Sequence, residues 1–232
     1  MNIAYVNADG GIPLFGGKGA AVHVRDVAQA LVALGHQVRI LTARSGAIPA
    51  GWSLPFDVIG TSAPESGESA ETRALRVNRR LRDALTRRHA AGPLELVYER
   101  YSLWSHAGLA FARRRQVPFV LEVNSPLVVE QSRYRTLDRE TTARRIERYL
   151  FSGATRVVAV SNEVADYVCQ HGGDPSRVVV VPNGVDLGLY ADASVRQPAD
   201  DRFTIGFLGS LKPWHGVHVL VDTLARLVAT DQ

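Results

Sequence analysis

Short apolar runs alternate with longer amphipathic segments along most of this chain. The short runs are rich in Val, Ile and Leu, which is typical of strands buried in a parallel sheet. The longer segments repeat their apolar side chains at helical spacing. In the first of them, Val24, Val27 and Leu31 lie three and four positions apart. A repeated order of strand and then helix predicts a doubly wound α/β domain around a parallel sheet.

The predicted elements follow one another from the first residues to residue 181. Strands are expected at residues 3–6, 36–42, 55–59, 94–98, 119–123, 157–160 and 178–181. Helices are expected after Gly19 and at residues 71–90, 103–115, 141–151 and 163–170. The last strand consists of four consecutive valines, a pattern that favours burial on both faces of the sheet.

The pattern changes after residue 181. Pro182 removes a backbone donor, and Asn183-Gly184 is a strong turn signal. A polar segment with Pro and Asp follows, and then a new strand is expected at 204–208 with a helix after Gly216. We therefore expect a Rossmann-like domain at residues 1–190, an interdomain linker at 191–202, and the first strand and helix of a second Rossmann-like domain at 203–232. In this interpretation the second domain is incomplete.

Two short sequences echo each other and support a second domain. Val22-His23-Val24 heads a helix after a glycine-rich loop, and Val217-His218-Val219 does the same near the end of the chain. A predicted strand precedes each of the two loops. The shared order of strand, glycine loop and helix is the opening unit of a Rossmann-like domain.

The turn at the end of the first domain also carries a family resemblance. Val181-Pro-Asn-Gly-Val-Asp186 resembles the interdomain junction of GT-B glycosyltransferases, in particular the retaining, family 4-like group. The resemblance extends over essentially the whole chain. It implies the transfer of a sugar from a nucleotide-sugar donor to an acceptor hydroxyl, with retention of configuration and without a bound metal or other cofactor. Such enzymes hold most of the donor in the second domain, so the 232-residue chain alone is expected to show little or no transfer. The alternative is a non-catalytic fragment or module that binds only the acceptor.

The glycine-rich loop before the first helix contains Gly16, Gly17, Lys18 and Gly19. A dinucleotide fingerprint would follow its strand directly, whereas about ten residues intervene here. A P-loop would need glycine where Ile12 stands and Ser or Thr where Gly19 stands. The resemblance instead places the three glycines near the donor diphosphate, where a helix N-terminus offers backbone N–H groups, and Lys18 near the acceptor. A purely structural turn remains the alternative.

Polar side chains follow the fourth and fifth predicted strands, at the sheet edge where open α/β domains bind ligands. The resemblance implies catalytic roles for Glu122 and Asn124, whose carboxylate and amide groups suit sugar hydroxyls. Many relatives carry a His-Asp pair where Asn124-Ser125 stands here. Four further residues are expected to bind the acceptor: Glu99, Tyr101, Arg133 and Tyr134. A structural network in which Glu99 and Glu122 pair with arginines is the competing interpretation.

A second glycine loop, at residues 207–216, belongs to the expected second domain. The resemblance implies that it grips the donor diphosphate through Gly209, Ser210, Lys212 and His215. Ser210 and His215 stand where relatives carry an arginine and a lysine. Lys212 lies between them and could supply the missing charge.

Composition narrows the setting further. The single cysteine, Cys169, excludes a disulfide framework, and neither a signal peptide nor an apolar run of about 18 residues is present. A cytoplasmic protein is therefore expected. The net charge of +4 comes almost wholly from arginine, which argues little for nucleic acid as a partner. An arginine-rich helix near residues 73–88 leaves two interpretations open, a solvated outer face or peripheral contact with an anionic membrane.

The apolar residues after about residue 191 have no later strands to cover them in this chain. Three outcomes follow for this tail: it is mobile, it packs on the first domain, or it pairs with another copy in a homo-oligomer. Proteolysis is expected to trim the tail to near Asp200 and leave a stable core.

Overall fold

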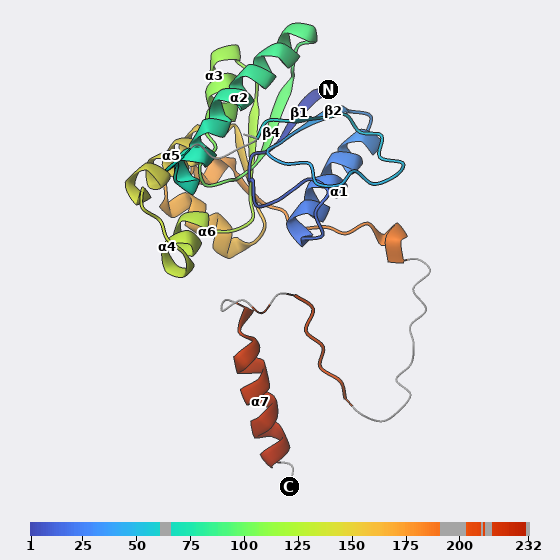
Figure 1. Cartoon of the computed structure of the whole chain (residues 1–232), viewed down its shortest axis with the longest axis vertical. Helices are drawn as coiled ribbons and strands as arrows, with labels where there is room; N and C mark the ends of the chain where they lie inside the picture. The colour runs from blue at the N-terminus through green and yellow to red at the C-terminus, as the bar shows by residue number, and fades with distance from the viewer. Residues whose placement is uncertain (61–65, 191–202, 210, 212–214, 231–232) are drawn as a thin grey trace. The chain divides into compact units, whose positions relative to one another are not determined.

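The computed structural model describes residues 1–60, 66–190, 203–209, 211 and 215–230. The chain divides into two compact units, Met1–Leu187 and Gly188–Gln232, and each is described by itself. The first unit is built on a seven-stranded parallel sheet with the strand order β3-β2-β1-β4-β5-β6-β7 (Figure 1). The doubly wound α/β fold class predicted from the sequence is therefore confirmed.

The elements of the first unit alternate as the sequence predicts. The strands are β1 Asn2–Asn7, β2 Gln37–Thr42, β3 Phe56–Val58, β4 Leu96–Arg100, β5 Phe119–Val123, β6 Arg156–Ala159 and β7 Val178–Val180. The helices are α1 Gly19–Ala33, α2 Ala70–Ala91, α3 Ala107–Arg115, α4 Leu127–Tyr134, α5 Glu140–Gly153 and α6 Asn162–Gln170. Short 3₁₀ turns lie at Pro175–Arg177 and Leu187–Tyr190.

The sheet separates two hydrophobic cores, because successive side chains of a strand point to opposite faces. On one face, Ile3 and Tyr5 of β1 pack with Val24 of α1. On the other face, Ala4 and Val6 of the same strand belong to the core that α2, α3, α5 and α6 complete. Figure 1 shows α1 on one side of the sheet and α2, α3 and α5 on the other. The two faces therefore offer different surroundings to neighbouring residues of a single strand.

Four expectations from the sequence need correction: two element boundaries, one helix that was not predicted, and the burial of one strand. The fourth strand begins and ends two residues later than predicted, so Glu99 lies inside it, where its side chain is buried. Helix α3 begins only at Ala107, because the preceding residues form the turn that follows β4. Helix α4 was not predicted; its eight residues follow Pro126 directly.

The valine strand is the fourth correction. β7 is an edge strand, paired only with β6, and Val179 and Val180 are 43% and 40% exposed. The prediction that this strand is buried on both faces is therefore wrong. Four valines specify a strand, but they do not specify its position in the sheet.

In the second unit, a helix after Gly216 was expected and is present as α7, Val217–Thr230. Residues 203–208 have no strand assignment, so the strand expected at 204–208 does not form. The expected linker at 191–202 lies outside the described residues.

Within the described ranges, no helix is both long and apolar enough to cross a membrane. The same ranges contain no group of three or more His, Cys, Asp or Glu side chains that could hold a metal ion.

Candidate functional site at the carboxyl edge of the sheet

The strand order reverses between β1 and β4. From β1 the chain continues to β2 and β3 on one side, and then crosses back to β4 on the other side. The carboxyl ends of these two strands, Asn7 and Arg100, are direct neighbours in the sheet. A crevice outside such a reversal is where open α/β sheets bind ligands. Helix α1 also begins at this edge, because it follows β1 through the glycine-rich loop.

The backbone of the loop before α1 is held in place by hydrogen bonds to the segment after β2 and to α1. The N–H groups of Leu14 and Phe15 donate to the carbonyls of Arg44 and Ser45 at 2.8 and 2.7 Å. Arg25 of α1 donates from Nη1 to the carbonyl of Leu14 at 2.6 Å. This loop is therefore a fixed part of the edge.

The predicted donor glycines of this loop differ in their surroundings. Gly17 and Gly19 are exposed, and a Cβ at either position would meet nothing within 4 Å, whereas at Gly16 it would lie 3.1 Å from the carbonyl oxygen of Pro13. Among the described residues, no side chain caps the N-terminus of α1, and its first turn contains no acidic residue. Backbone N–H groups at such an end suit an anion. Lys18, predicted on the acceptor side, donates from Nζ to the carbonyl of Gly11 at 2.9 Å.

The most connected group at this edge is a buried carboxylate with two partners. Glu122 of β5 accepts from His23 Nε2 of α1 at 2.8 Å through Oε1, and from the hydroxyl of Tyr98 of β4 at 2.7 Å through Oε2. The ring of Tyr5 stacks on Tyr98 with their centroids 5.0 Å apart. The side chain of Glu122 is only 5% exposed and that of His23 is 15% exposed. Both carboxylate oxygens are thus used inside the protein, and the imidazole of His23 is more exposed than the carboxylate that it contacts.

The electrostatics of this group keep the carboxyl ionised. Burial raises the pKa of Glu122, but the hydrogen bonds from His23 and Tyr98 and the charge of Arg100 outweigh it, so the pKa lies below its ordinary value. Burial and the neighbouring Glu122 raise the pKa of Tyr98 above its usual range, so its hydroxyl stays protonated and remains a donor. At neutral pH the group therefore contains a carboxylate with two fixed donors.

Asn124, the second predicted catalytic residue, follows β5 at the same edge. Its Nδ2 donates to Oδ1 of Asn183 at 3.4 Å, and its own Oδ1 is buried without a hydrogen-bond partner among the described residues. The contact joins the end of β5 to the Asn183-Gly184 turn. The sequence motif at the domain exit and the predicted site are thus neighbours in space.

Two of the predicted acceptor residues lie on the opposite face of the sheet. Glu99 has no exposed surface, and Tyr101 is only 2% exposed. The hydroxyl of Tyr101 donates to Glu147 of α5 at 2.9 Å, and Glu147 also accepts from Tyr167. The structure therefore does not bring Glu99 and Tyr101 together with Glu122, and neither side chain is open to a ligand in this conformation.

The remaining predicted residues lie elsewhere. Arg133 and Tyr134 are exposed at the end of α4, where the guanidinium carbon of Arg133 lies 5.4 Å from the ring centroid of Tyr134. Gly209 and His215 belong to the second unit, where the His215 ring lies 5.8 Å from that of Phe207. Ser210 and Lys212 lie outside the described residues.

Reasoning from sequence missed His23 and Tyr98 as members of the site. The one available signal for His23 was its position in the Val22-His23-Val24 sequence at the head of α1. Tyr98 gave no signal of its own, because a tyrosine within a strand usually belongs to the core.

Comparisons with known proteins show the family of this chain and proteins that share its fold. A family model described as Glycosyltransferase Family 4 matches residues 17–189, a range that includes Gly17, Glu122 and the Asn183 turn. A D-inositol 3-phosphate glycosyltransferase of Kineococcus radiotolerans is 32% identical over 152 residues, which cover 61% of this chain and 35% of that protein. D-inositol 3-phosphate glycosyltransferase 2 of Catenulispora acidiphila is 28% identical over 229 residues, which cover 92% of this chain and 53% of that protein. The chain thus spans about a third to a half of the length of these curated relatives.

Solved structures share the fold. HepE of Anabaena in complex with UDP superimposes with a TM-score of 0.67 at 20% identity, over 97% of this chain and 58% of HepE. Sucrose-phosphate synthase of Thermosynechococcus elongatus gives a TM-score of 0.60 at 17% identity, over 82% of this chain and 49% of that protein.

Proposed function

Because the chain belongs to glycosyltransferase family 4, we propose that it acts in the transfer of a sugar from a nucleotide-sugar donor to an acceptor hydroxyl, with retention of configuration. The observation that carries this proposal is the group formed by His23, Glu122 and Tyr98 at the strand-order reversal. A buried, ionised carboxylate that holds a partly exposed imidazole at the carboxyl edge of an open sheet is an arrangement typical of functional sites.

In this proposal Glu122 acts by positioning His23. Both oxygens of Glu122 are occupied, whereas Nδ1 of His23 makes no hydrogen bond to any described residue. His23 is therefore the group that contacts a substrate hydroxyl or the departing phosphate oxygen. The buried Oδ1 of Asn124 supplies an acceptor for a second hydroxyl nearby.

The donor side of the proposal rests on the start of α1. Gly17 and Gly19 leave the backbone open to approach, and the first turn of α1 has neither a side-chain cap nor an acidic residue. The positive end of the helix dipole and its unpaired N–H groups would stabilise the charge of a departing diphosphate. The assignment of Gly209 and His215 to the same diphosphate is part of the proposal, as is the division of the chain into an acceptor-side domain and a donor-side segment.

The names of similar proteins suggest the first substrates to test. HepE was crystallised with UDP-glucose, and the two curated relatives are named for D-inositol 3-phosphate. UDP-glucose is therefore the first donor, and D-inositol 3-phosphate the first acceptor.

The test incubates the chain, and a longer form that carries a complete donor domain, with UDP-sugars, alone and with D-inositol 3-phosphate. Mass spectrometry and NMR follow the products. A glycosylated acceptor with the anomeric configuration of the donor would support the proposal. Binding of the acceptor without donor binding or transfer would instead support the acceptor-binding module. Absence of binding to any sugar nucleotide or acceptor would contradict both.

A further inference from the structure

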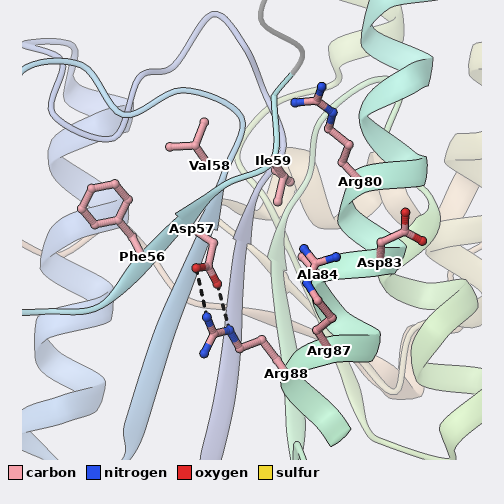
Figure 2. A pocket seen from close by; sticks show the side chains of 9 residues that line it. All are labelled: Phe56, Asp57, Val58, Ile59, Arg80, Asp83, Ala84, Arg87 and Arg88. Carbon is pink, nitrogen blue, oxygen red and sulfur yellow. Dashed lines mark hydrogen bonds and ion pairs between the residues drawn. The ribbon is translucent and has the colours of Figure 1, made fainter. Parts of the chain in front are cut away.

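A hollow lies between the edge strand β3 and helix α2. Its volume is about 540 Å³. The side chains or backbone of Phe56, Asp57, Val58, Ile59, Arg80, Asp83, Ala84, Arg87 and Arg88 line it. Figure 2 shows Asp57 of β3 turned toward Arg88, with Arg80 and Asp83 farther along α2. None of these residues belongs to the group of His23, Glu122 and Tyr98.

The spacing of the lining residues on α2 explains the hollow. Positions 80, 84, 87 and 88 recur at helical spacing and therefore share one face of α2. Ala84 is the small residue between the arginines, so the long side chains on either side of it border an open space. Three arginines and two aspartates line the hollow, which leaves its lining with a net charge of +1.

The aspartate of β3 is already neutralised. Asp57 accepts from Arg88 Nε at 2.9 Å and Nη2 at 3.1 Å, and Arg39 Nη1 lies 3.3 Å from its Oδ1. This bidentate pair orients Arg88 and leaves its Nη1 group unused by Asp57. Asp57 therefore positions a cation instead of repelling an incoming anion.

The other two arginines have donors that the described protein groups do not use. Arg80 donates from Nη1 to the carbonyl of Gly60, and a guanidinium has five N–H donors in all. Arg87 is exposed and makes no hydrogen bond or ion pair with any described residue. An anion in the hollow would thus find guanidinium donors that no protein group uses.

The backbone of β3 adds neutral donors. The carbonyl of Pro55 accepts from Ile40 N–H and the N–H of Ile59 donates to Thr42, so this register turns the N–H groups of Phe56 and Val58 outward from the sheet. Phe56 buries its ring against Phe15 in the other core, so it is its backbone that lines the hollow. Unpaired N–H groups beside guanidinium groups are the usual setting for a phosphate.

We propose that this hollow binds a small phosphate-bearing molecule through Arg80, Arg87 and Arg88. Phosphate matches the donor set better than a single carboxylate does, because its oxygens can accept from several guanidinium groups and a backbone N–H at once. Arg88 is the oriented member, and Arg80 and Arg87 close around the anion.

The experiment titrates the chain with inorganic phosphate at constant ionic strength and follows backbone amides by NMR. The amides of Val58 and Ala84 should shift with one saturating curve. Arg80→Gln and Arg87→Gln should each weaken that curve about tenfold, as expected for the loss of a charge-assisted hydrogen bond. Asp83→Asn removes a negative charge from the lining and should tighten binding. The matched control is Arg79→Gln, an exposed arginine of the same helix outside the hollow, which should leave the affinity unchanged.

Several results would overturn the proposal. These are an equal loss in the Arg79 control, the same shifts with sodium chloride, or shifts confined to Gly17 and Gly19 at the carboxyl edge. Shifts confined to Gly17 and Gly19 would contradict the phosphate site at β3 and α2 but not the proposed transferase site. Absence of transferase activity would contradict the proposed function but not this phosphate site.

Discussion

Two buried glutamates, Glu122 and Glu99, have pKa values shifted in opposite directions because their surroundings differ. Glu122 has two donors and a lowered pKa, whereas the carboxylate oxygens of Glu99, on the neighbouring strand and the other face, make no direct hydrogen bond to the described residues. Burial raises the pKa of Glu99 to about 7, although the nearby Ser105 hydroxyl acts in the opposite direction. Each carboxyl therefore makes a different, measurable prediction.

For Glu122 the prediction concerns catalysis. Glu122→Gln keeps the shape of the side chain but removes the charge that holds His23. In an enzyme that carries this domain together with a complete donor domain, acceptor-dependent transfer should therefore fall about 10- to 100-fold, more than donor hydrolysis does. Steady-state rates with and without acceptor measure both losses. Glu147→Gln is the matched control, because Glu147 is an equally buried carboxyl on the opposite face. Equal losses of both reactions in Glu122→Gln would indicate a structural or donor role.

For Glu99 the prediction concerns the pH dependence of stability. Its pKa in the folded state lies above the ordinary 4.5, so the native protein keeps a proton that the unfolded chain releases between pH 4.5 and about 7. Ionisation of Glu99 therefore costs no stability below this window, and it costs progressively more as the pH rises through it. The free energy of unfolding of Glu99→Gln, relative to that of wild type, should rise by up to about 3 kcal/mol between pH 4 and pH 8.

Urea unfolding of both proteins across this pH range measures the difference. Glu130→Gln, on the exposed part of α4, is the control and should follow the wild-type profile. A constant difference between Glu99→Gln and wild type at all pH values would show that Glu99 does not titrate in this window.

At the scale of elements, the glycine-rich loop and α1 act as one unit, because Arg25 of the helix binds the loop backbone. Gly17→Val should leave the fold unchanged, since nothing lies within 4 Å of a Cβ there. In a full-length enzyme it should lower turnover by blocking backbone approach to the donor. Thermal unfolding and kinetics separate the two effects. Gly16→Val is the contrasting variant, because its Cβ would press on the carbonyl of Pro13 and should cost stability. Normal turnover in folded Gly17→Val would reduce the loop to a turn.

The sequence predicted the elements well and their environments less well. Short runs of apolar and β-branched residues located all seven strands of the first unit, because such residues favour strands whether or not both faces are buried. It could not identify β7 as an edge strand, since strand order is set by crossovers between distant segments. The same limit applies to the site. Glu122 stood out as a carboxyl at a strand end, but its partners His23 and Tyr98 are 99 and 24 residues away along the chain. Only the β1–β4–β5 pairing brings them together.

At the scale of the molecule, the first unit contains a complete core. The buried hydrophobic side chains of the described residues lie between Ile3 and Val168, and all seven strands lie within Met1–Leu187. A protein of residues 1–187 should therefore fold alone and unfold in a single cooperative transition. Circular dichroism and urea titration would check this. A non-cooperative transition would show that residues beyond 187 are needed for the core.

The division of ionisable groups between the two faces of the sheet also bears on misfolding. A slip of β4 by one residue past β1 would exchange the faces of Tyr98 and Glu99. The carboxyl of Glu99 would then enter the aromatic core around Tyr5, and Glu122 would lose its phenol donor. A tyrosine ring would meanwhile meet the first turn of α3, where even a Cβ on Gly108 would lie 1.9 Å from Glu99 Oε2. A misregistered β4 is thus destabilised on both faces of the sheet. The residues at the carboxyl edge therefore also disfavour folding intermediates in which β4 pairs in the wrong register.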